Sequence, residues 1–124
     1  MQSDVSLATT LSGGLDSNAI NSTIVKSLGR KKDIHAFSLL AEDVPDESIL
    51  INESVKELDI YHEYINLSHA DYQSAIDEML MFHDEPTYSP GQINQFVFRK
   101  KIKEKGYKVL LVGDGADEIL SGYA

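Results

Sequence analysis

The sequence contains no cysteine, and this absence excludes several kinds of site. Disulfides, thiolate metal centres and cysteine nucleophiles are impossible, which agrees with a reducing compartment such as the cytoplasm. No apolar run approaches the roughly 20 residues that span a bilayer. The first residues, Met1 to Asp4, have neither the basic region nor the long apolar run of a signal peptide. We therefore expect a cytoplasmic protein with no membrane partner.

Basic residues are also scarce, at 11 lysines and arginines against 20 acidic residues, which gives a formal net charge of −9. Such a chain repels nucleic-acid backbones unless it has a local basic patch. The one basic run is Arg99-Lys100-Lys101, followed by Lys103 and Lys105. It falls late in a predicted helix, where cations favour the helix dipole and a solvated face is common. We predict no nucleic-acid partner.

Four apolar segments alternate with helix-forming segments, and each has the length of a buried strand: 5–11, 34–40, 60–67 and 107–112. Between them, apolar residues recur at helical spacing in four groups: Ile20, Ile24 and Leu28; Ile51, Val55 and Leu58; Tyr72, Ile76, Met79 and Leu80; and Ile93, Phe96, Val97 and Ile102. Gly29 is placed to end the first helix, Asp46 to cap the second and Ser68 to cap the third. The two prolines within residues 83–90 predict an irregular loop.

This alternation predicts an α/β fold, a doubly wound parallel sheet in a single domain over residues 1–124. Right-handed crossovers permit the strand order 3-2-1-4, in which the first strand lies beside the fourth. The segment 107–112 is the most apolar of the chain, and we expect it to be a central strand. In such sheets ligands bind beyond the carboxyl ends of the strands, where the strand order reverses.

The stretch Ser12-Gly13-Gly14-Leu15-Asp16-Ser17 follows the first predicted strand and precedes the first helix. A glycine turn before a helix aims backbone N–H groups and a positive helix end at an anion. Asp16 would repel a phosphate unless a cation lay between them, so the loop predicts a site for a magnesium-bound polyphosphate. The alternative is an ordinary turn with Asp or Ser as helix N-cap. The Walker pattern and the dinucleotide fingerprint do not match here.

A second loop, 113–118, follows the last predicted strand and contains Asp114, Asp117 and Glu118. Carboxylates suit a hard cation such as Mg²⁺, held by one or two of them together with phosphate oxygens. The alternative is an acidic helix N-terminus, and Glu118 fits this alternative better than a ligand role. Asp117 is the better ligand candidate, paired with Asp16 across the crevice that the order 3-2-1-4 creates.

The first loop resembles the pyrophosphate-binding loop of the ATP pyrophosphatase (PP-loop) superfamily. The second, from Val112 to Tyr123, is similar to the segment that asparagine synthetases carry at this place. Asp84-Glu85-Pro86 and His62-Glu63 also have counterparts in that family, and the resemblance extends in colinear order over nearly the whole chain. It implies an adenine-nucleotide alpha hydrolase-like fold and a carbon–nitrogen ligase that uses ATP and Mg²⁺.

The resemblance also implies roles for individual residues. The pyrophosphate of ATP would lie against Ser12, Gly13, Gly14 and Ser17, and the adenosine against Leu11, Phe37, Ser38, Leu39 and Gly113. Asp16 and Asp117 would hold magnesium, and Asp114 would order the substrate side, so that Asp114 and Asp117 are the catalytic candidates. The aspartate β-carboxylate would be adenylated and then amidated by ammonia from glutamine.

The chain also departs from the family pattern. Asn18 and Ser121 stand where many members have Ser or Thr and Gly, respectively. The family's glutaminase domain, which begins with a cysteine, and the later part of its synthetase domain have no counterpart here. We therefore expect a nucleotide-binding core that binds Mg-ATP weakly and cannot make asparagine alone. Two other interpretations stay open: a related synthetase that closes a β-lactam or amidates a sugar, and a nucleotide-binding module without catalysis.

Overall fold

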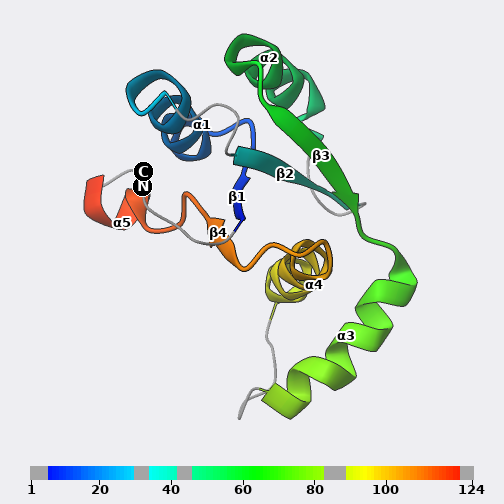
Figure 1. Ribbon diagram of the computed structural model, residues 1–124. Coiled ribbons are helices and arrows are strands. Elements are labelled where there is room, and N and C mark those ends of the chain that lie inside the picture. The colour runs from blue at the N-terminus through cyan, green and yellow to red at the C-terminus, as the bar shows by residue number, and fades with distance from the viewer. Residues whose placement is uncertain (1–5, 30–33, 42–45, 83–88, 121–124) are drawn as a thin grey trace.

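The computed structural model describes residues 6–29, 34–41, 46–82 and 89–120. Its four strands form one parallel sheet in the order β3-β2-β1-β4 (Figure 1), with the bounds β1 Leu7–Thr10, β2 Ile34–Leu40, β3 Tyr61–Asn66 and β4 Val109–Leu111. The predicted strand order is therefore confirmed. Most of the predicted irregular loop, residues 83–88, lies outside the described residues, and so does Ser121.

Helices lie on both faces of the sheet, as predicted for a doubly wound fold. Their bounds are α1 Leu15–Ser22, η1 Thr23–Ser27, α2 Ser48–Leu58, α3 His69–Phe82, α4 Pro90–Glu104 and α5 Ala116–Leu120. Figure 1 shows α1 and α2 on one side of the sheet and α4, with α3 beside it, on the other. None of the helices in the described segments has the length and hydrophobicity that a bilayer crossing requires.

Each face of the sheet has its own hydrophobic core. On the side of α1 and α2 the buried residues are Leu11, Ile24, Ile34, Ala36, Ile51, Leu58 and Ile60. On the side of α4 they are Ala8, Phe37, Ile65, Leu67, Ala75, Val97, Phe98 and Ile102. Neighbouring residues of β2, such as Ala36 and Phe37, point to opposite faces, as the period of two in a strand requires.

The segment 107–112 was expected to form a central strand, and this expectation is wrong. Among the described strands, β4 pairs with β1 alone and lies at an edge of the sheet. The apolar residues of β4 pack on both faces of the sheet. Leu110 packs against the core on the α4 side, and Leu111 packs against the core on the α1 side. A strand buried on two faces looks the same in sequence whether it has one neighbour or two.

The first helix departs from regular α-helical spacing at its end. Residues Thr23–Ser27 form a π-helical turn, in which the Leu28 N–H bonds the Thr23 carbonyl oxygen, five residues earlier, at 3.1 Å. The wider turn moves Leu28 off the predicted inward stripe, and its side chain is half exposed, whereas Ile24 is buried. Gly29 follows with a φ of 62°, a left-handed conformation that favours glycine and ends the helix as predicted.

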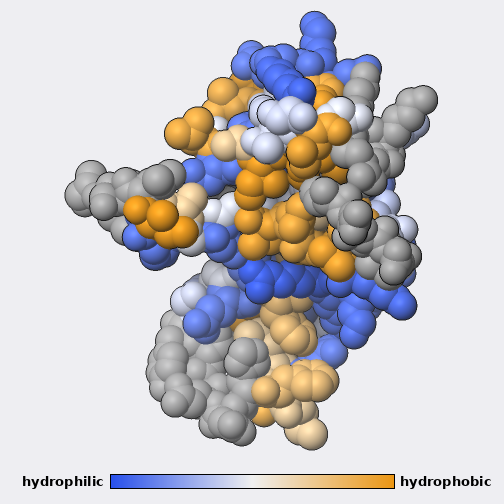
Figure 2. All heavy atoms as spheres, turned by 60° about the vertical axis from the view of Figure 1, so that its left-hand side comes forward, coloured by the Kyte–Doolittle hydropathy of each residue, from blue (hydrophilic) through white to orange (hydrophobic). Residues whose placement is uncertain are grey.

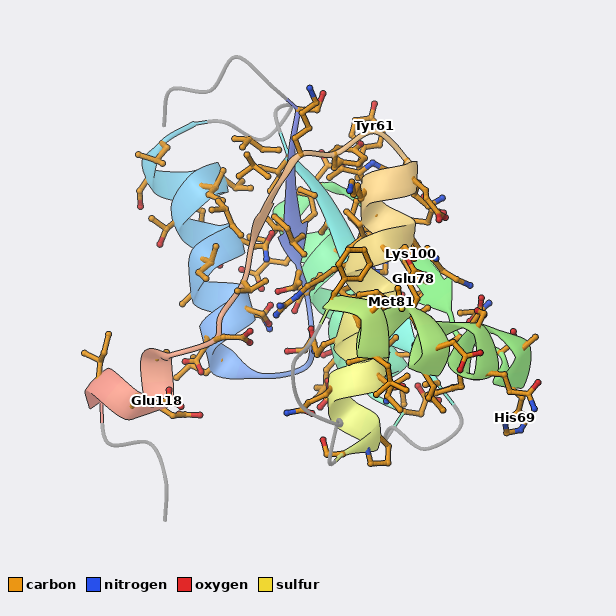
Figure 3. The ribbon with its side chains drawn as sticks, turned by 90° about the horizontal axis from the view of Figure 1, so that it is seen from below. Tyr61, His69, Glu78, Met81, Lys100 and Glu118 are labelled. Atoms are coloured by element: carbon orange, nitrogen blue, oxygen red, sulfur yellow. The ribbon has the colours of Figure 1, made fainter. Side chains whose placement is uncertain are left out.

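The predicted inward face of α3 is only partly correct. Ala75 and Met79 are buried and Tyr72 packs against the core, but Ile76 and Leu80 are exposed. The physical reason is that α3 packs chiefly on α4, which covers a narrow stripe of the helix. Figure 3 shows Glu78 of α3 facing Lys100 of α4, and these two residues form an ion pair.

The basic run on α4 forms ion pairs that tie this helix to its surroundings. Besides Lys100, Lys101 pairs with Asp71 at 2.9 Å and Lys105 pairs with Glu63 of β3 at 2.5 Å. Asp71 also completes the cap of α3, because its carboxylate accepts the Ser68 N–H at 2.8 Å while its own N–H bonds Ser68 Oγ at 3.3 Å. Ser68 therefore caps this helix, as predicted.

These contacts predict an acid-sensitive contribution from Asp71. The Ser68 N–H, and then the Lys101 ammonium, lower the pKa of Asp71 to about 2 from 3.8. Asp71→Asn should lower the free energy of unfolding by about 1 kcal/mol at pH 7, the usual cost of a lost cap. A lowered carboxylate pKa stabilises the fold above the unfolded value, so the difference should disappear as the pH falls from about 4 to about 2.

Urea unfolding at several pH values would measure this difference. Asp77→Asn is the matched control, since Asp77 is an exposed residue of the same helix. Equal losses in the two variants would contradict the assignment.

Candidate functional site

A cavity of about 520 Å³ opens beyond the carboxyl ends of β1, β2 and β4. Its described lining comprises Thr10, Leu11, Ser12, Gly14, Asp16, Ser17, Phe37, Leu39, Leu40, Glu47, Ile51, Gln95, Phe98, Val112, Gly113, Asp114, Gly115, Asp117 and Glu118. Twelve site residues were predicted from the sequence. Ten of them line the cavity, and the two that do not are Gly13 and Ser38. The strand order thus brings both predicted loops to one crevice.

The two loops touch at Gly113. A Cβ placed on this glycine would lie 3.1 Å from Asp16 Cβ and 3.1 Å from the Ser17 nitrogen. Both distances are shorter than ordinary carbon contacts, so a side chain here would push the end of β4 and the start of α1 apart by a few tenths of an ångström. Gly113 therefore sets the spacing between the loop after β1 and the loop after β4.

The loop after β1 is held together by its own polar groups. Ser17 Oγ accepts the Ser12 N–H at 3.0 Å, and Ser12 Oγ accepts the Gly14 N–H at 3.2 Å. The Asn18 side-chain amide donates to the carbonyl oxygens of Ser12 at 3.0 Å and Gly14 at 2.7 Å. Asn18, which departs from the family pattern, therefore stabilises the loop.

The N-terminus of α1 opens on the cavity without a side-chain cap. The N-cap residue is Gly14, which makes no side-chain hydrogen bond. The alternative of an ordinary turn required Asp or Ser at this position. A helix N-terminus whose cap residue has no side chain leaves its first N–H groups accessible to an outside acceptor.

Asn21 is a buried residue that the sequence reasoning missed. Its side-chain oxygen accepts Thr9 Oγ1–H at 2.7 Å, and its amide nitrogen donates to the carbonyl oxygens of Thr10 at 3.0 Å and Ser17 at 2.8 Å. It thereby fixes α1 against β1, directly beneath the loop. The signal was available, because Asn21 lies one helical turn after Ser17 on the same face.

Ser38, nominated for the adenosine, is buried and supports the cavity wall from behind. Its Oγ donates to the Leu11 carbonyl oxygen at 2.5 Å and lies 2.8 Å from His62 Nε2. Because the hydroxyl proton goes to Leu11, His62 Nε2–H is the donor to Ser38 Oγ. Burial lowers the pKa of His62, and the neighbouring His35 lowers it further. The resulting chain of hydrogen bonds links β3 and β2 to the end of β1.

Gly13 is not among the lining residues of the cavity and lies against the start of α2. Its N–H donates to Glu47 Oε2 at 2.8 Å. A Cβ on Gly13 would lie 2.9 Å from Leu50 Cδ1, so this side chain would have to shift to admit a larger residue. Glu47 was not nominated from the sequence, where nothing distinguishes it from other acidic residues of a helix N-terminus.

Carboxylates dominate the charge of the cavity. Its acidic lining residues are Asp16, Glu47, Asp114, Asp117 and Glu118, and no lysine, arginine or histidine is found among the described lining residues. Asp114 forms an exposed ion pair with Arg99 of α4 at 3.2 Å, and Glu118 lies on α5 (Figure 3). On the face shown in Figure 2, hydrophilic residues form a belt directly below a hydrophobic area of the surface.

Within the described part of the chain, no group of three or more metal-binding side chains is assembled. The pairing of Asp16 with Asp117 across the cavity stays a prediction. One or two carboxylates are the number that Mg²⁺ uses when phosphate oxygens and water supply its other ligands. The donors present are therefore of the right type for that cation.

The chain matches the family model described as asparagine synthase over residues 1–124. It is 33% identical to asparagine synthetase [glutamine-hydrolyzing] 1 of Arabidopsis thaliana, over 99% of this chain and 22% of the plant protein. It is 31% identical to a putative asparagine synthetase of Methanocaldococcus jannaschii, over 99% of this chain and 24% of the archaeal protein. The chain thus spans about a quarter of the length of these relatives.

A solved structure shares the fold. Glutamine-dependent NAD⁺ synthetase from Acinetobacter baumannii, in complex with ADP, has a TM-score of 0.61 and 16% identity, with 98% of this chain and 24% of that chain covered.

The contact between the loops predicts the effect of a side chain at Gly113. Gly113→Ala should lower the free energy of unfolding by about 1–2 kcal/mol, because the neighbours that must move are mostly backbone atoms and a Cβ. Gly91→Ala is the control, since its added Cβ would lie 3.5 Å from Ser89 Oγ and the residue is helical. Urea titrations would compare the two, and equal stabilities would contradict the proposed close contact.

Proposed function

The chain belongs to the asparagine synthase family, and we propose that it is the ATP-binding core of an asparagine synthetase-like amidotransferase. In this proposal the core belongs to a protein that adenylates the side-chain carboxylate of aspartate and amidates it with ammonia from glutamine. The nucleotide-binding core occupies residues 1–124, and a glutaminase domain would supply the ammonia.

One observation carries the ATP assignment: a loop built to accept an anion opens into a cavity lined by carboxylates. The first N–H groups of α1 have no side-chain cap, and the Ser12 and Ser17 hydroxyls, which hydrogen-bond each other, line the same cavity. The five acidic residues around them would repel a free anion, and no described lining residue offers a positive charge. A polyphosphate that arrives with a divalent cation fits both features, because its oxygens accept from the donors and its cation binds the carboxylates.

The proposed residue roles are those that the family resemblance implies, and ten of the twelve residues concerned line the cavity. The pyrophosphate lies against Ser12, Gly13, Gly14 and Ser17, and the adenosine lies between the ends of β1 and β2, near Leu11, Phe37, Ser38, Leu39 and Gly113. Magnesium would be held by Asp16 and Asp117, where it would neutralise negative charge on the leaving pyrophosphate. Asp114 orders the substrate side, with Arg99 holding its carboxylate.

The proposed reaction has two steps. A carboxylate oxygen of aspartate attacks the α-phosphorus of ATP, and the bond from that phosphorus to the bridging oxygen breaks, which releases pyrophosphate. Ammonia then attacks the acyl carbon, and the bond from that carbon to the oxygen shared with phosphorus breaks. AMP leaves with this oxygen, and the nitrogen loses a proton to give the amide. In both steps the loops position the reacting groups, so that the orientation is set before the bonds change.

A substitution at Gly14 separates a ligand-binding role from a structural one. Gly14 has an ordinary φ of −77°, and a Cβ there would meet only Ser12 Oγ, at 3.4 Å. Gly14→Ala should therefore leave the thermal midpoint nearly unchanged. A phosphate lying against the loop would meet the added methyl group, so calorimetry should show Mg-ATP affinity falling about 10-fold, the scale of a small steric misfit. Unchanged affinity would contradict the phosphate site.

The two aspartates test the cation. Asp16→Asn and Asp117→Asn should each weaken Mg-ATP binding by about 10-fold, because each removes one negative ligand from the cation. Asp77→Asn on the distant helix α3 is the charge-matched control. Affinities equal to that of the control, measured by calorimetry with ATP and Mg²⁺, would refute the metal assignment. Exchange of labelled pyrophosphate into ATP, with aspartate present, would test catalysis, and we expect none from residues 1–124 alone.

A further inference from the structure

Glu47 occupies one of the backbone donors of the loop. Its carboxylate oxygen Oε2 accepts the Gly13 N–H at 2.8 Å, and its side chain lines the cavity. Gly13 belongs to the turn that aims its N–H groups at an anion. A carboxylate oxygen therefore lies where an oxygen of a bound phosphate would accept this hydrogen bond.

The position of Glu47 is fixed by the structure around it. Its carbonyl oxygen accepts the Ile51 N–H at 3.0 Å in the first turn of α2. Leu50, in the same turn, packs against Gly13 so closely that a Cβ on the glycine would lie 2.9 Å from Leu50 Cδ1. The α2 backbone thus holds the Glu47 carboxylate beside the loop.

The carboxylate of Glu47 has no role in capping its own helix. Glu47 is the N-cap residue of α2 but makes no side-chain cap hydrogen bond. Asp46 supplies the cap instead, because its Oδ1 accepts the Ser48 N–H at 2.9 Å. The contact of Glu47 is with the loop, 34 residues away in sequence.

We propose that Glu47 is a specificity-determining residue, an internal competitor that makes the loop reject polyphosphates that carry no divalent cation. The inference rests on the proposed function of the loop. A free polyphosphate must take the Gly13 N–H from the carboxylate and then lie beside its negative charge. A cation-bound polyphosphate brings positive charge into the same cavity, so the carboxylate no longer opposes it.

The test uses the full chain and pyrophosphate as the probe. Calorimetry measures the Kd of pyrophosphate with excess EDTA and again with excess Mg²⁺, for the wild type, Glu47→Gln and Glu47→Asp. Glu53→Gln is the matched control, because it removes the same charge from an exposed position of α2 outside the cavity. Thermal midpoints of all variants establish that they are folded.

Glu47→Gln should bind metal-free pyrophosphate about 5-fold more tightly than wild type, the effect of removing one nearby like charge at a solvated site. Its affinity for the magnesium complex should change less than 2-fold. Glu47→Asp keeps the charge and should resemble the wild type more closely than Glu47→Gln does. In the unliganded protein, the Gly13 amide resonance should shift in Glu47→Gln and stay in place in Glu53→Gln.

Three results would overturn the inference. They are equal affinities of Glu47→Gln and Glu53→Gln for metal-free pyrophosphate, an unmoved Gly13 resonance, and weaker binding of the magnesium complex by Glu47→Gln, which would make Glu47 a ligand of the cation. If the wild type binds the magnesium complex, any of these results leaves the proposed function standing. If the wild type binds neither form of pyrophosphate, the proposed function itself fails.

Discussion

The site depends on one constraint, the parallel pairing of β1 with β2 on one edge and β4 on the other. The first crossover from β1 leads to β2, and the chain reaches β4 only after β3, so the strand order reverses at β1. The carboxyl ends of β1 and β4 then lie side by side. Their loops approach until Gly113 touches the first turn of α1. Without this pairing, the serines of one loop and the carboxylates of the other would not share a cavity.

Much of this arrangement could be predicted because it depends on features that sequence records directly. The period of apolar residues, the two glycine loops and the direction of crossovers indicated the strand order and the meeting of the two loops at one crevice. The family resemblance added the cavity residues at the ends of the first two strands. The errors have a common cause, which is that periodicity does not report what an element packs against. Ile76 and Leu80 have helical spacing but stay exposed. The residues of β4 are apolar because this edge strand packs against a core on each face of the sheet. The π-helical turn that exposes Leu28 has no signature in the apolar pattern.

Polar contacts between distant segments were the least predictable part of the site. Glu47 meets Gly13 and His62 meets Ser38 only after α2 and β3 have been placed by hydrophobic packing. The charges show the same dependence, since the basic residues of α4 pair with Glu63, Asp71, Glu78 and Asp114. The net charge of −9 therefore does not show where the negative charge gathers. Five acidic residues line the cavity, and of these basic residues Arg99 pairs with one of them, Asp114.

The buried amide of Asn21 has a consequence for how a ligand is received. Two of its hydrogen bonds reach Thr9 and Thr10 of β1, so a shift of α1 along β1 would leave these polar groups without their partners. Such a shift is costly, so the start of α1, where the loop ends, keeps its position before any ligand arrives. The conformational entropy of ordering this part of the loop is lost during folding and does not subtract from the free energy of association.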